Sequence, residues 1–351
     1  MQEKRNLIIA GSIFGVLAVG LVALGNPANM GFCIACFYRD LAGSLGLHSA
    51  GVVQYARPEI MGLILGSFVI SLIKGEFKSR GGSSPVLRFI IAFFVMIGAL
   101  VFLGCPFRMI LRLAGGDLNA LVALFGFASG IGVGGILLNK GFSLGRSYPQ
   151  ARAEGTAFSA AALVMVVIAV FLPMLLKAST SGPGSQHAPI LISLAAGLIV
   201  GSLAQRTRLC MAGGIRDLFL FKDPTLLLGS AAVLVVALIL NLATGSFKLG
   251  FTGQPIAHTQ WLWNFLGMGL VGYGSVLLGG CPLRQTILAG EGNSDSAVTV
   301  LGFLAGAAVS HNFGLASSGQ GATTAGKIAT LVGFAVITLI ALAVMKKQAR
   351  S

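Results

Sequence analysis

The sequence predicts an all-α membrane protein that crosses the bilayer many times. Hydrophobic residues make up 55% of the 351-residue chain and charged residues only 10%, whereas soluble domains carry about 25% charged residues. Apolar stretches of roughly 17–22 residues recur along the chain, which is the length of helix that spans a bilayer. Many of the 50 glycines lie inside these stretches, where small residues let membrane helices approach one another closely.

Ten membrane-spanning helices are expected from these apolar stretches. The first is predicted to be a retained helix rather than a removed signal peptide, because no small-residue cleavage site precedes Gly25. The expected spans cover residues 6–24, 57–74, 87–104, 118–139, 157–176, 188–205, 224–243, 261–280, 296–316 and 325–345.

The net charge of +14 could serve nucleic-acid binding or membrane orientation. The basic residues are concentrated in the loops between apolar stretches, and most of them fall in loops on the same side as the N-terminus. Basic loops orient membrane proteins and lie against the anionic inner leaflet. We therefore expect the basic residues to interact with the lipid bilayer and not with nucleic acid. We also expect both termini to lie in the cytoplasm.

The chain contains an internal repeat, because segments of the first half recur in the second half in the same order and at almost constant separation. We expect an N-terminal membrane repeat at residues 1–176, a Gly/Ser/Pro-rich linker at 177–189 and a C-terminal membrane repeat at 190–351. The matching segments are GFCIACFYRDL (31–41) with RLCMAGGIRDL (208–218), GCPFR (104–108) with GCPLR (280–284), and LFGFASG (124–130) with VLGFLAG (300–306).

Each repeat holds five expected spans, and an odd number of crossings places the second repeat upside down. This is the inverted-repeat plan of many transporters, whose substrate sites lie near the bilayer midplane. The motif cysteines fall in segments too short to span, with Cys33 and Cys105 on the outer side and Cys210 and Cys281 on the inner side. We expect these segments to be re-entrant half-helices, because non-helical backbone at that depth must be enclosed by protein or line a cavity.

The two Gly-Cys-Pro-x-Arg motifs are typical of helix starts. Proline favours the first helical position, so the preceding cysteine is expected at the N-cap, where free N–H groups and the helix dipole attract anions and favour a thiolate. The arginines are expected to draw anions inward or to pair with Asp40 and Asp217, and the glycines to permit a tight turn and close approach of a ligand. The residues concerned are Gly104, Cys105, Arg108, Gly279, Gly280, Cys281 and Arg284.

The motif residues are also compatible with roles other than anion binding. A buried cysteine can be simply a small apolar residue, but four of the five cysteines occupy repeat-related positions. The Cys33-x-x-Cys36 segment could be a redox pair or half of a metal site, although no Cys/His cluster lies nearby and no metal is expected. Two Arg-Asp pairs are expected to be structural, with an anion-attracting rim as the alternative. These pairs are Arg39–Asp40 and Arg216–Asp217.

At these motifs the sequence resembles the YeeE/YedE family of bacterial inner-membrane transporters for thiosulfate and related sulfur compounds. The resemblance covers essentially the whole chain and is carried by FCIACFYRD and LCMAGGIRD, each followed by a Gly-Cys-Pro motif. It implies an hourglass of spanning helices with short helices meeting at a narrow waist, where cysteines pass a thiosulfate ion along by S–H···S contacts. The implied positions are Cys105, Cys210 and Cys281, with Cys33 ranked lower.

One departure from the family pattern concerns the cargo. The second repeat keeps the expected glycine as Gly213, whereas the first repeat carries Cys36. The chain looks closest to the YedE-like branch linked to selenium metabolism, and an extra thiol fits a softer, more thiol-reactive selenium species. The resemblance also implies a bacterial inner-membrane location and a cytosolic sulfur-carrier protein as partner.

The leading hypothesis is therefore an uptake transporter for a small inorganic selenium- or sulfur-containing anion, without enzymatic activity and without a cofactor. A membrane enzyme for thiol redox exchange or sulfur or selenium transfer, using Cys33 and Cys36, is the alternative from another class. The extra Cys36 slightly favours that alternative, whereas the absence of a soluble domain or quinone-site signature disfavours it. The chain also shows no Walker, dinucleotide-binding or hydrolytic motif. A structural membrane protein with incidental cysteines is the third hypothesis.

Overall fold

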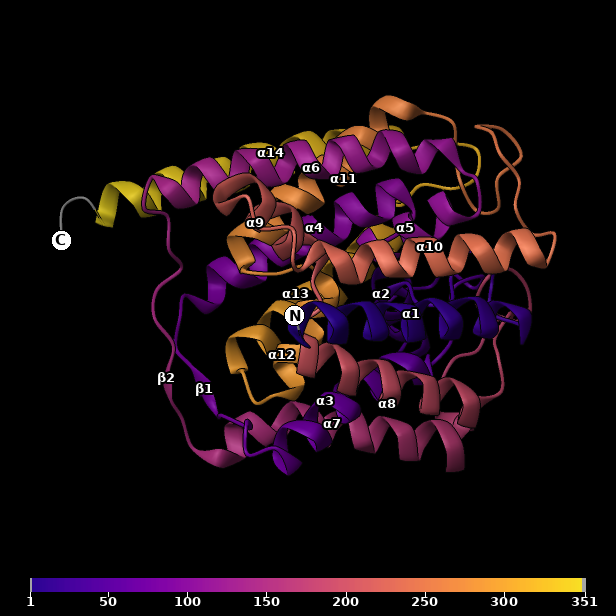
Figure 1. Ribbon diagram of the computed structural model, residues 1–351, viewed down its shortest axis with the longest axis horizontal. Helices are drawn as coiled ribbons and strands as arrows, with labels where there is room; N and C mark the ends of the chain where they lie inside the picture. The colour runs from indigo at the N-terminus through magenta and orange to yellow at the C-terminus, as the bar shows by residue number, and fades with distance from the viewer. Residues whose placement is uncertain (1, 349–351) are drawn as a thin grey trace.

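Four short α-helices are interspersed among ten long ones in this computed structural model, which describes residues 2–348 (Figure 1). Met1, the first residue of the expected N-terminal repeat, lies outside the described residues, as do residues 349–351, the last of the expected C-terminal repeat. The first half contains α1 (Gln2–Ala23), α2 (Ile34–Ser44), α3 (Pro58–Ile73), α4 (Pro85–Phe102), α5 (Pro106–Ala114), α6 (Leu118–Asn139) and α7 (Arg152–Phe171). The second half contains α8 (Ile190–Thr207), α9 (Met211–Phe221), α10 (Leu227–Ala243), α11 (Trp261–Leu278), α12 (Pro282–Gly290), α13 (Ser294–Asn312) and α14 (Thr324–Gln348).

Little other regular structure accompanies the helices in residues 2–348. A short 3₁₀ turn covers Pro173–Leu175 after α7. Two strands of two residues each, β1 (Arg80–Gly81) and β2 (Tyr148–Pro149), pair antiparallel between loops of the first half. The expectation of an all-α fold is confirmed.

The ten longest helices occupy the ten stretches expected to span a membrane, within a few residues at each end. By length and composition, seven helical segments of the described chain can cross a bilayer. The helices α3 and α10 are apolar but shorter, and α13, which carries His311 and Asn312 near its end, is not among the seven. The chain is a multi-pass membrane protein.

Four short helices lie between the long ones, and each begins directly after a motif cysteine. Along the bundle axis, α2 and α5 lie toward one end, and α9 and α12 lie toward the other (Figure 1). The side chain of Cys33 accepts a hydrogen bond from the Cys36 N–H (3.2 Å), and that of Cys210 accepts one from the Gly213 N–H (3.3 Å). These contacts satisfy free donors of the first turn, which explains why the helices start there.

Sharp breaks separate α4 from the short helix α5 and α11 from the short helix α12. The chain adopts the left-handed conformation at Leu103, with φ of 69°, and at the repeat-related Gly279, with φ of 83°. Glycine takes this conformation freely, whereas leucine is strained there. Pro106 and Pro282 then occupy the first helical positions of α5 and α12, as expected.

The long helices pack in pairs that join the two halves. The pair α3 with α8 has its counterpart in α1 with α10, and the pair α6 with α11 has its counterpart in α4 with α13. Exchanging the two halves therefore maps these helix pairs onto each other. Each pair joins a helix of one half to a helix of the other, so the two halves pack mainly against each other. The last helices depart from this pattern, because α7 packs on α3 and α12 whereas α14 packs on α4 and α11.

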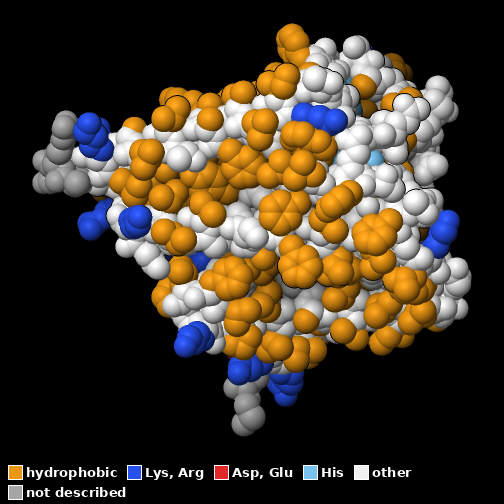
Figure 2. Space-filling model, turned by 90° about the horizontal axis from the view of Figure 1, so that it is seen from above, with side chains coloured by type: hydrophobic (Ala, Val, Ile, Leu, Met, Phe, Trp, Pro, Cys, Tyr) orange, Lys and Arg blue, Asp and Glu red, His pale blue; other side chains and the backbone are white. Residues whose placement is uncertain are grey.

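Glycines set the close approach of these pairs. A Cβ atom added at Gly62 of α3 would lie 2.6 Å from the Leu194 carbonyl oxygen and 2.8 Å from the Gly197 Cα of α8. Figure 2 shows that hydrophobic side chains cover a broad band of the outer face, whereas Lys and Arg side chains lie mainly at its margins. This distribution suits a protein whose flanks face lipid and whose loops face water.

Candidate functional site

The five cysteines lie inside the bundle at the starts of the four short helices. Their exposed fractions are 4% or less, so the sulfur atoms are shielded from bulk water. Contacts between α2 and α12 and between α5 and α9 join short helices of opposite halves. The Tyr38 hydroxyl of α2 and the Thr286 hydroxyl of α12 form one such contact at 2.8 Å. The structure therefore brings the predicted cysteines into one central region.

We call the part at α9 and α12 inner and the part at α2 and α5 outer, after the orientation expected from the sequence. The inner part contains two free thiols in contact. The Sγ atoms of Cys210 and Cys281 lie 3.7 Å apart, within hydrogen-bonding distance for sulfur. Both side chains belong to the free cysteines of the described chain, together with Cys105. Since α9 and α12 start from these residues, the two thiols also lie at the positive ends of two helix dipoles.

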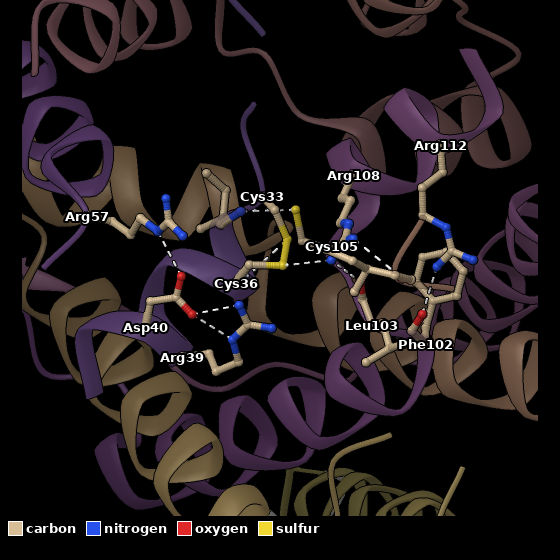
Figure 3. Close-up of a disulfide and its surroundings, with 12 residues drawn as sticks. Cys33, Cys36, Arg39, Asp40, Arg57, Phe102, Leu103, Cys105, Arg108 and Arg112 are labelled. Carbon is tan, nitrogen blue, oxygen red and sulfur yellow. Dashed lines mark hydrogen bonds and ion pairs between the residues drawn. A yellow bond between two sulfur atoms is a disulfide. The ribbon is translucent and has the colours of Figure 1, made fainter. Parts of the chain in front are cut away.

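The outer part contains a disulfide between Cys33 and Cys36 (Figure 3). Both residues are fully buried. The free thiol of Cys105 lies next to this disulfide, and its sulfur accepts a hydrogen bond from the Ile34 N–H at 3.2 Å. Of the alternatives for Cys33-x-x-Cys36, the structure shows the oxidised pair. In residues 2–348, no three His, Cys, Asp or Glu side chains are grouped as a metal site requires.

The Arg108 side chain is fully buried beside the disulfide. Its Nη1 donates to the Leu103 carbonyl at 2.7 Å and to the Cys36 sulfur at 3.3 Å, and its Nη2 donates to the Ile256 carbonyl at 3.4 Å. The first of these bonds stabilises the strained left-handed residue at the break. The expected alternative of pairing with Asp40 was wrong, because Asp40 is bonded to other arginines.

The repeat-related Arg284 has a different partner. Its guanidinium forms an ion pair with Glu291 at 3.1 Å, and the expected alternative of pairing with Asp217 was wrong. The Arg284–Glu291 pair lines a polar cavity of about 520 Å³ at the inner end, which we call the inner vestibule. Burial raises the pKa of the Glu291 carboxyl above its ordinary value. The charged and amide residues of the inner vestibule are Glu76, Lys78, Arg80, Gln205, Arg206, Arg208, Arg284 and Glu291.

The two predicted Arg-Asp pairs both form, with unequal burial. Asp40 is fully buried and accepts from Arg39 at 2.6 Å and from Arg57 at 2.7 Å, whereas Arg216 and Asp217 are partly exposed and lie 2.7 Å apart. Arg57 was not among the predicted site residues. Figure 3 shows its contact with Asp40. It also donates to backbone carbonyls of Pro183 and Gln186, so it ties the expected linker to the first half.

The motif glycines make room for the arginine side chains. A Cβ atom at Gly104 would lie 2.7 Å from Cδ of Arg108, and one at Gly280 would lie 2.8 Å from Cγ of Arg284. The left-handed conformation of the turn falls one residue earlier, at Leu103 and Gly279. The expected tight turn is present at Gly279. Gly104 and Gly280 have another role, because their missing side chains admit an arginine of the chain itself.

Further buried contacts involve residues outside the predicted set. Arg112 and Asp117 are both fully buried and form an ion pair at 2.7 Å, and Arg112 lies 4.2 Å over the ring of Phe102. The rings of His311 and His48 are in contact, with centroids 4.7 Å apart and planes tilted by 31°. The sequence could have indicated the Arg112–Asp117 pair, because two opposite charges stand five residues apart on either side of a pair of glycines. No sequence signal points to the histidine contact.

Broken helices with cysteines and arginines buried at the breaks define this chain as a multi-pass membrane protein of the discontinuous-helix type. Residues 206–349 match the family model described as Sulphur transport. Thiosulfate transporter TsuA of Escherichia coli (strain K12) is 30% identical over 123 residues, which are 34% of each chain. Thiosulfate transporter TsuA of Spirochaeta thermophila is 33% identical over 99 residues, 28% of this chain and 29% of the relative.

The second half of the chain is therefore similar to sulphur-transport proteins. The matched segments span about a third of the length of these curated relatives. The family model covers the second half of the chain from Arg206 onward, which includes Cys210, Cys281 and Arg284.

Proposed function

We propose that this protein transports a small sulfur- or selenium-containing anion across the bacterial inner membrane. The observation that carries the proposal is the contact between two free, buried thiols, Cys210 and Cys281, each at the N-terminal end of a short helix. Weak S–H donors and helix dipoles can bind a soft anion without holding it tightly. The sulphur-transport family and the names of the two relatives agree with this proposal.

The proposed path runs from the outside toward the cytoplasm past the cysteines in series. An anion would meet the Cys33–Cys36 pair and Cys105 first, and then Cys281 and Cys210. It would leave through the inner vestibule, whose five basic side chains outnumber its two carboxylates. Such an excess of positive charge raises the local concentration of an anion and lowers the barrier at the exit.

The proposed topology is an inverted repeat with both termini in the cytoplasm. It is supported by the contact pattern that maps onto itself when the halves are exchanged, and by the short helices that lie toward opposite ends of the bundle (Figure 1). The boundaries proposed for the repeats remain 1–176 and 190–351. A cytosolic sulfur-carrier protein would receive the cargo at the inner vestibule.

A second candidate function is a membrane enzyme that exchanges disulfides or transfers sulfur or selenium. The observation that favours it is the buried disulfide in a Cys-x-x-Cys segment at a helix start, an arrangement shared by redox-active pairs. An enzyme would cycle this pair between disulfide and dithiol during turnover. A transporter that uses thiols only as weak donors would keep the pair in one state.

Uptake into cells tests the transporter proposal. Cells that express the protein would receive labelled thiosulfate and labelled selenium compounds in parallel, and the Cys281→Ser variant would be compared at equal membrane abundance. We expect uptake of a selenium species that is lost in the variant. Uptake of thiosulfate alone would indicate that this protein carries thiosulfate, as the names of its two relatives say of them. Uptake of neither label above the empty-vector level would contradict transport.

A further inference from the structure

The two halves neutralise their repeat-related arginines in different ways. Arg284 of the second half forms an ion pair with the carboxylate of Glu291. The residue of the first half that corresponds to Glu291 is Gly115, which has no side chain to offer. Arg108 is nevertheless the more deeply buried of the two arginines, at 0% against 15% exposure.

Arg108 therefore lacks an anionic partner in the described structure. Its hydrogen bonds go to two backbone carbonyls and to the Cys36 sulfur, and its Nε has no partner at all. Burying a charge without a counter-charge costs several kcal/mol. A buried cation of this kind indicates that an anion forms or binds beside it during function.

The residue that replaces the missing carboxylate is Cys36. Its position in the second half is held by Gly213, so the first half has lost a carboxylate and gained a thiol at the same arginine. In the disulfide the Cys36 sulfur is neutral. If the bond to Cys33 breaks with its electron pair on Cys36, a thiolate forms 3.3 Å from the guanidinium, and the arginine acquires its counter-charge.

We propose that the Cys33–Cys36 disulfide captures a hydrosulfide or hydroselenide ion reversibly and covalently, with Arg108 holding the Cys36 thiolate that this reaction releases. The inference rests on the proposed transport function and names a class of cargo for the outer site. These ions are small, soft nucleophiles that attack disulfides by ordinary thiol–disulfide exchange chemistry.

The proposed step balances without another reactant. The chalcogen of the HS⁻ or HSe⁻ ion attacks Cys33 Sγ, a sulfur–chalcogen bond forms, and the Cys33–Cys36 bond breaks with its electron pair on Cys36. Cys33 then carries an –SH or –SeH group, the bound chalcogen is oxidised by two electrons, and the disulfide is reduced by two. In the return step, the Cys36 thiolate attacks Cys33 Sγ, re-forms the disulfide and expels the same ion.

The surroundings of the pair suit this assignment of roles. Cys36 contacts the arginine, so it is the better leaving group, whereas Cys33 lies at the N-cap of α2 without that contact. Both sulfur atoms are fully buried, which protects the adduct from water and from large thiols. Cys105, next to Cys33, is the first free thiol that a released ion meets on the proposed path.

Trapping the adduct tests the inference directly. The full-length protein, purified without reductant, would be mixed under anaerobic conditions with hydrosulfide or hydroselenide and then denatured in a thiol-alkylating reagent. Peptide mass spectrometry should find Cys33 carrying one additional sulfur or selenium atom and Cys36 alkylated. Thiosulfate in place of these ions should give at least tenfold less adduct, and an equal yield would overturn the proposed class of cargo.

Variants separate the roles of the side chains. Arg108→Gln should reduce adduct formation roughly tenfold to a hundredfold, the range expected from losing a charged hydrogen bond, and Arg108→Lys should recover part of it. Cys36→Gly, which restores the residue of the second half, should abolish the adduct. Circular dichroism and elution volume would establish that each variant is folded. An unchanged yield in folded Arg108→Gln would overturn the role of Arg108.

Two outcomes distinguish this inference from the transport proposal. Cys210→Ser, a change in the inner part of the path, should abolish uptake while leaving adduct formation at Cys33 intact. Uptake of the label by wild-type protein without any adduct at Cys33 would overturn the covalent step and leave transport standing. An adduct at Cys33 without uptake would support the covalent step and contradict transport.

Discussion

The sulfur atoms of Cys210 and Cys281 lie 3.7 Å apart although 71 residues separate the two cysteines in the chain. The distance is short enough for a disulfide to form after a small rearrangement, and the two thiols have no other sulfur bonded to them. At this contact the two short helices of the inner region meet, so a covalent bond here would close the proposed path at its inner part.

Mild oxidation should join Cys210 to Cys281 and block uptake. A disulfide would remove both S–H donors from the proposed path, so we expect uptake to fall at least tenfold and to return when a dithiol reductant is added. Non-reducing peptide mapping would identify the bond. The Cys281→Ser variant cannot form it, and formation of a bond from Cys210 to any other cysteine would contradict the geometry.

The buried charge cluster around Asp40 should stabilise the fold more than its exposed counterpart. Asp40→Asn leaves two buried arginines without a carboxylate, and breaking a buried ion pair in this way costs about 3–5 kcal/mol. Asp217→Asn is the matched control, because its partner Arg216 is partly exposed and such pairs contribute about 1 kcal/mol or less. Thermal unfolding in detergent should rank the variants in this order, and equal melting temperatures would contradict the role of Asp40.

Uptake should increase as the pH falls through the pKa of Glu291. Burial raises this pKa, so the carboxyl group takes up a proton at a higher pH than an exposed glutamate would. Protonation removes the negative charge that pairs with Arg284 and makes the inner vestibule more attractive to an anion. Glu291→Gln should therefore show the high rate at neutral pH and lose this part of the pH dependence. Uptake rates of both proteins measured between mildly acidic and neutral pH would check the prediction.

The glycine at the α3–α8 contact should be intolerant of substitution. Gly62→Ala would place a methyl group 2.6 Å from the Leu194 carbonyl oxygen, and overpacking of this kind costs about 1–3 kcal/mol. Gly20→Ala in α1 is the control, because nothing lies within 4 Å of the added atom and alanine favours a helix. Loss of stability in the control rather than in Gly62→Ala would contradict the packing described for these helices.

Much of the fold could be predicted because its signals are local. Apolar length alone located the ten long helices, and the Cys-Pro dipeptides located the starts of α5 and α12, since proline suits the first helical position. The central position of the cysteines also followed from the repeat, because equivalent short segments that enter from opposite sides must meet inside the bundle.

The charge partners could not be predicted because they depend on long-range packing. Arg57 reaches Asp40 and the linker only once α3 is placed against α2. Arg108 finds the Leu103 carbonyl because the chain takes a left-handed turn at a leucine, a conformation that residue type alone argues against. The sequence offered Asp40 and Asp217 as partners for the two motif arginines, whereas the helix directions carry these arginines to a disulfide in one half and to a glutamate in the other.

Arg284 has the carboxylate of Glu291 as its neighbour, whereas the corresponding Arg108 has the sulfur of Cys36. This difference has a consequence for what each arginine responds to. At Arg284 the countercharge is the carboxyl group of Glu291, so its presence depends on the local proton activity. At Arg108 the neighbour is a sulfur that becomes anionic only when its bond to Cys33 opens. Acidity therefore acts on one of these two arginines, and the state of a sulfur–sulfur bond acts on the other.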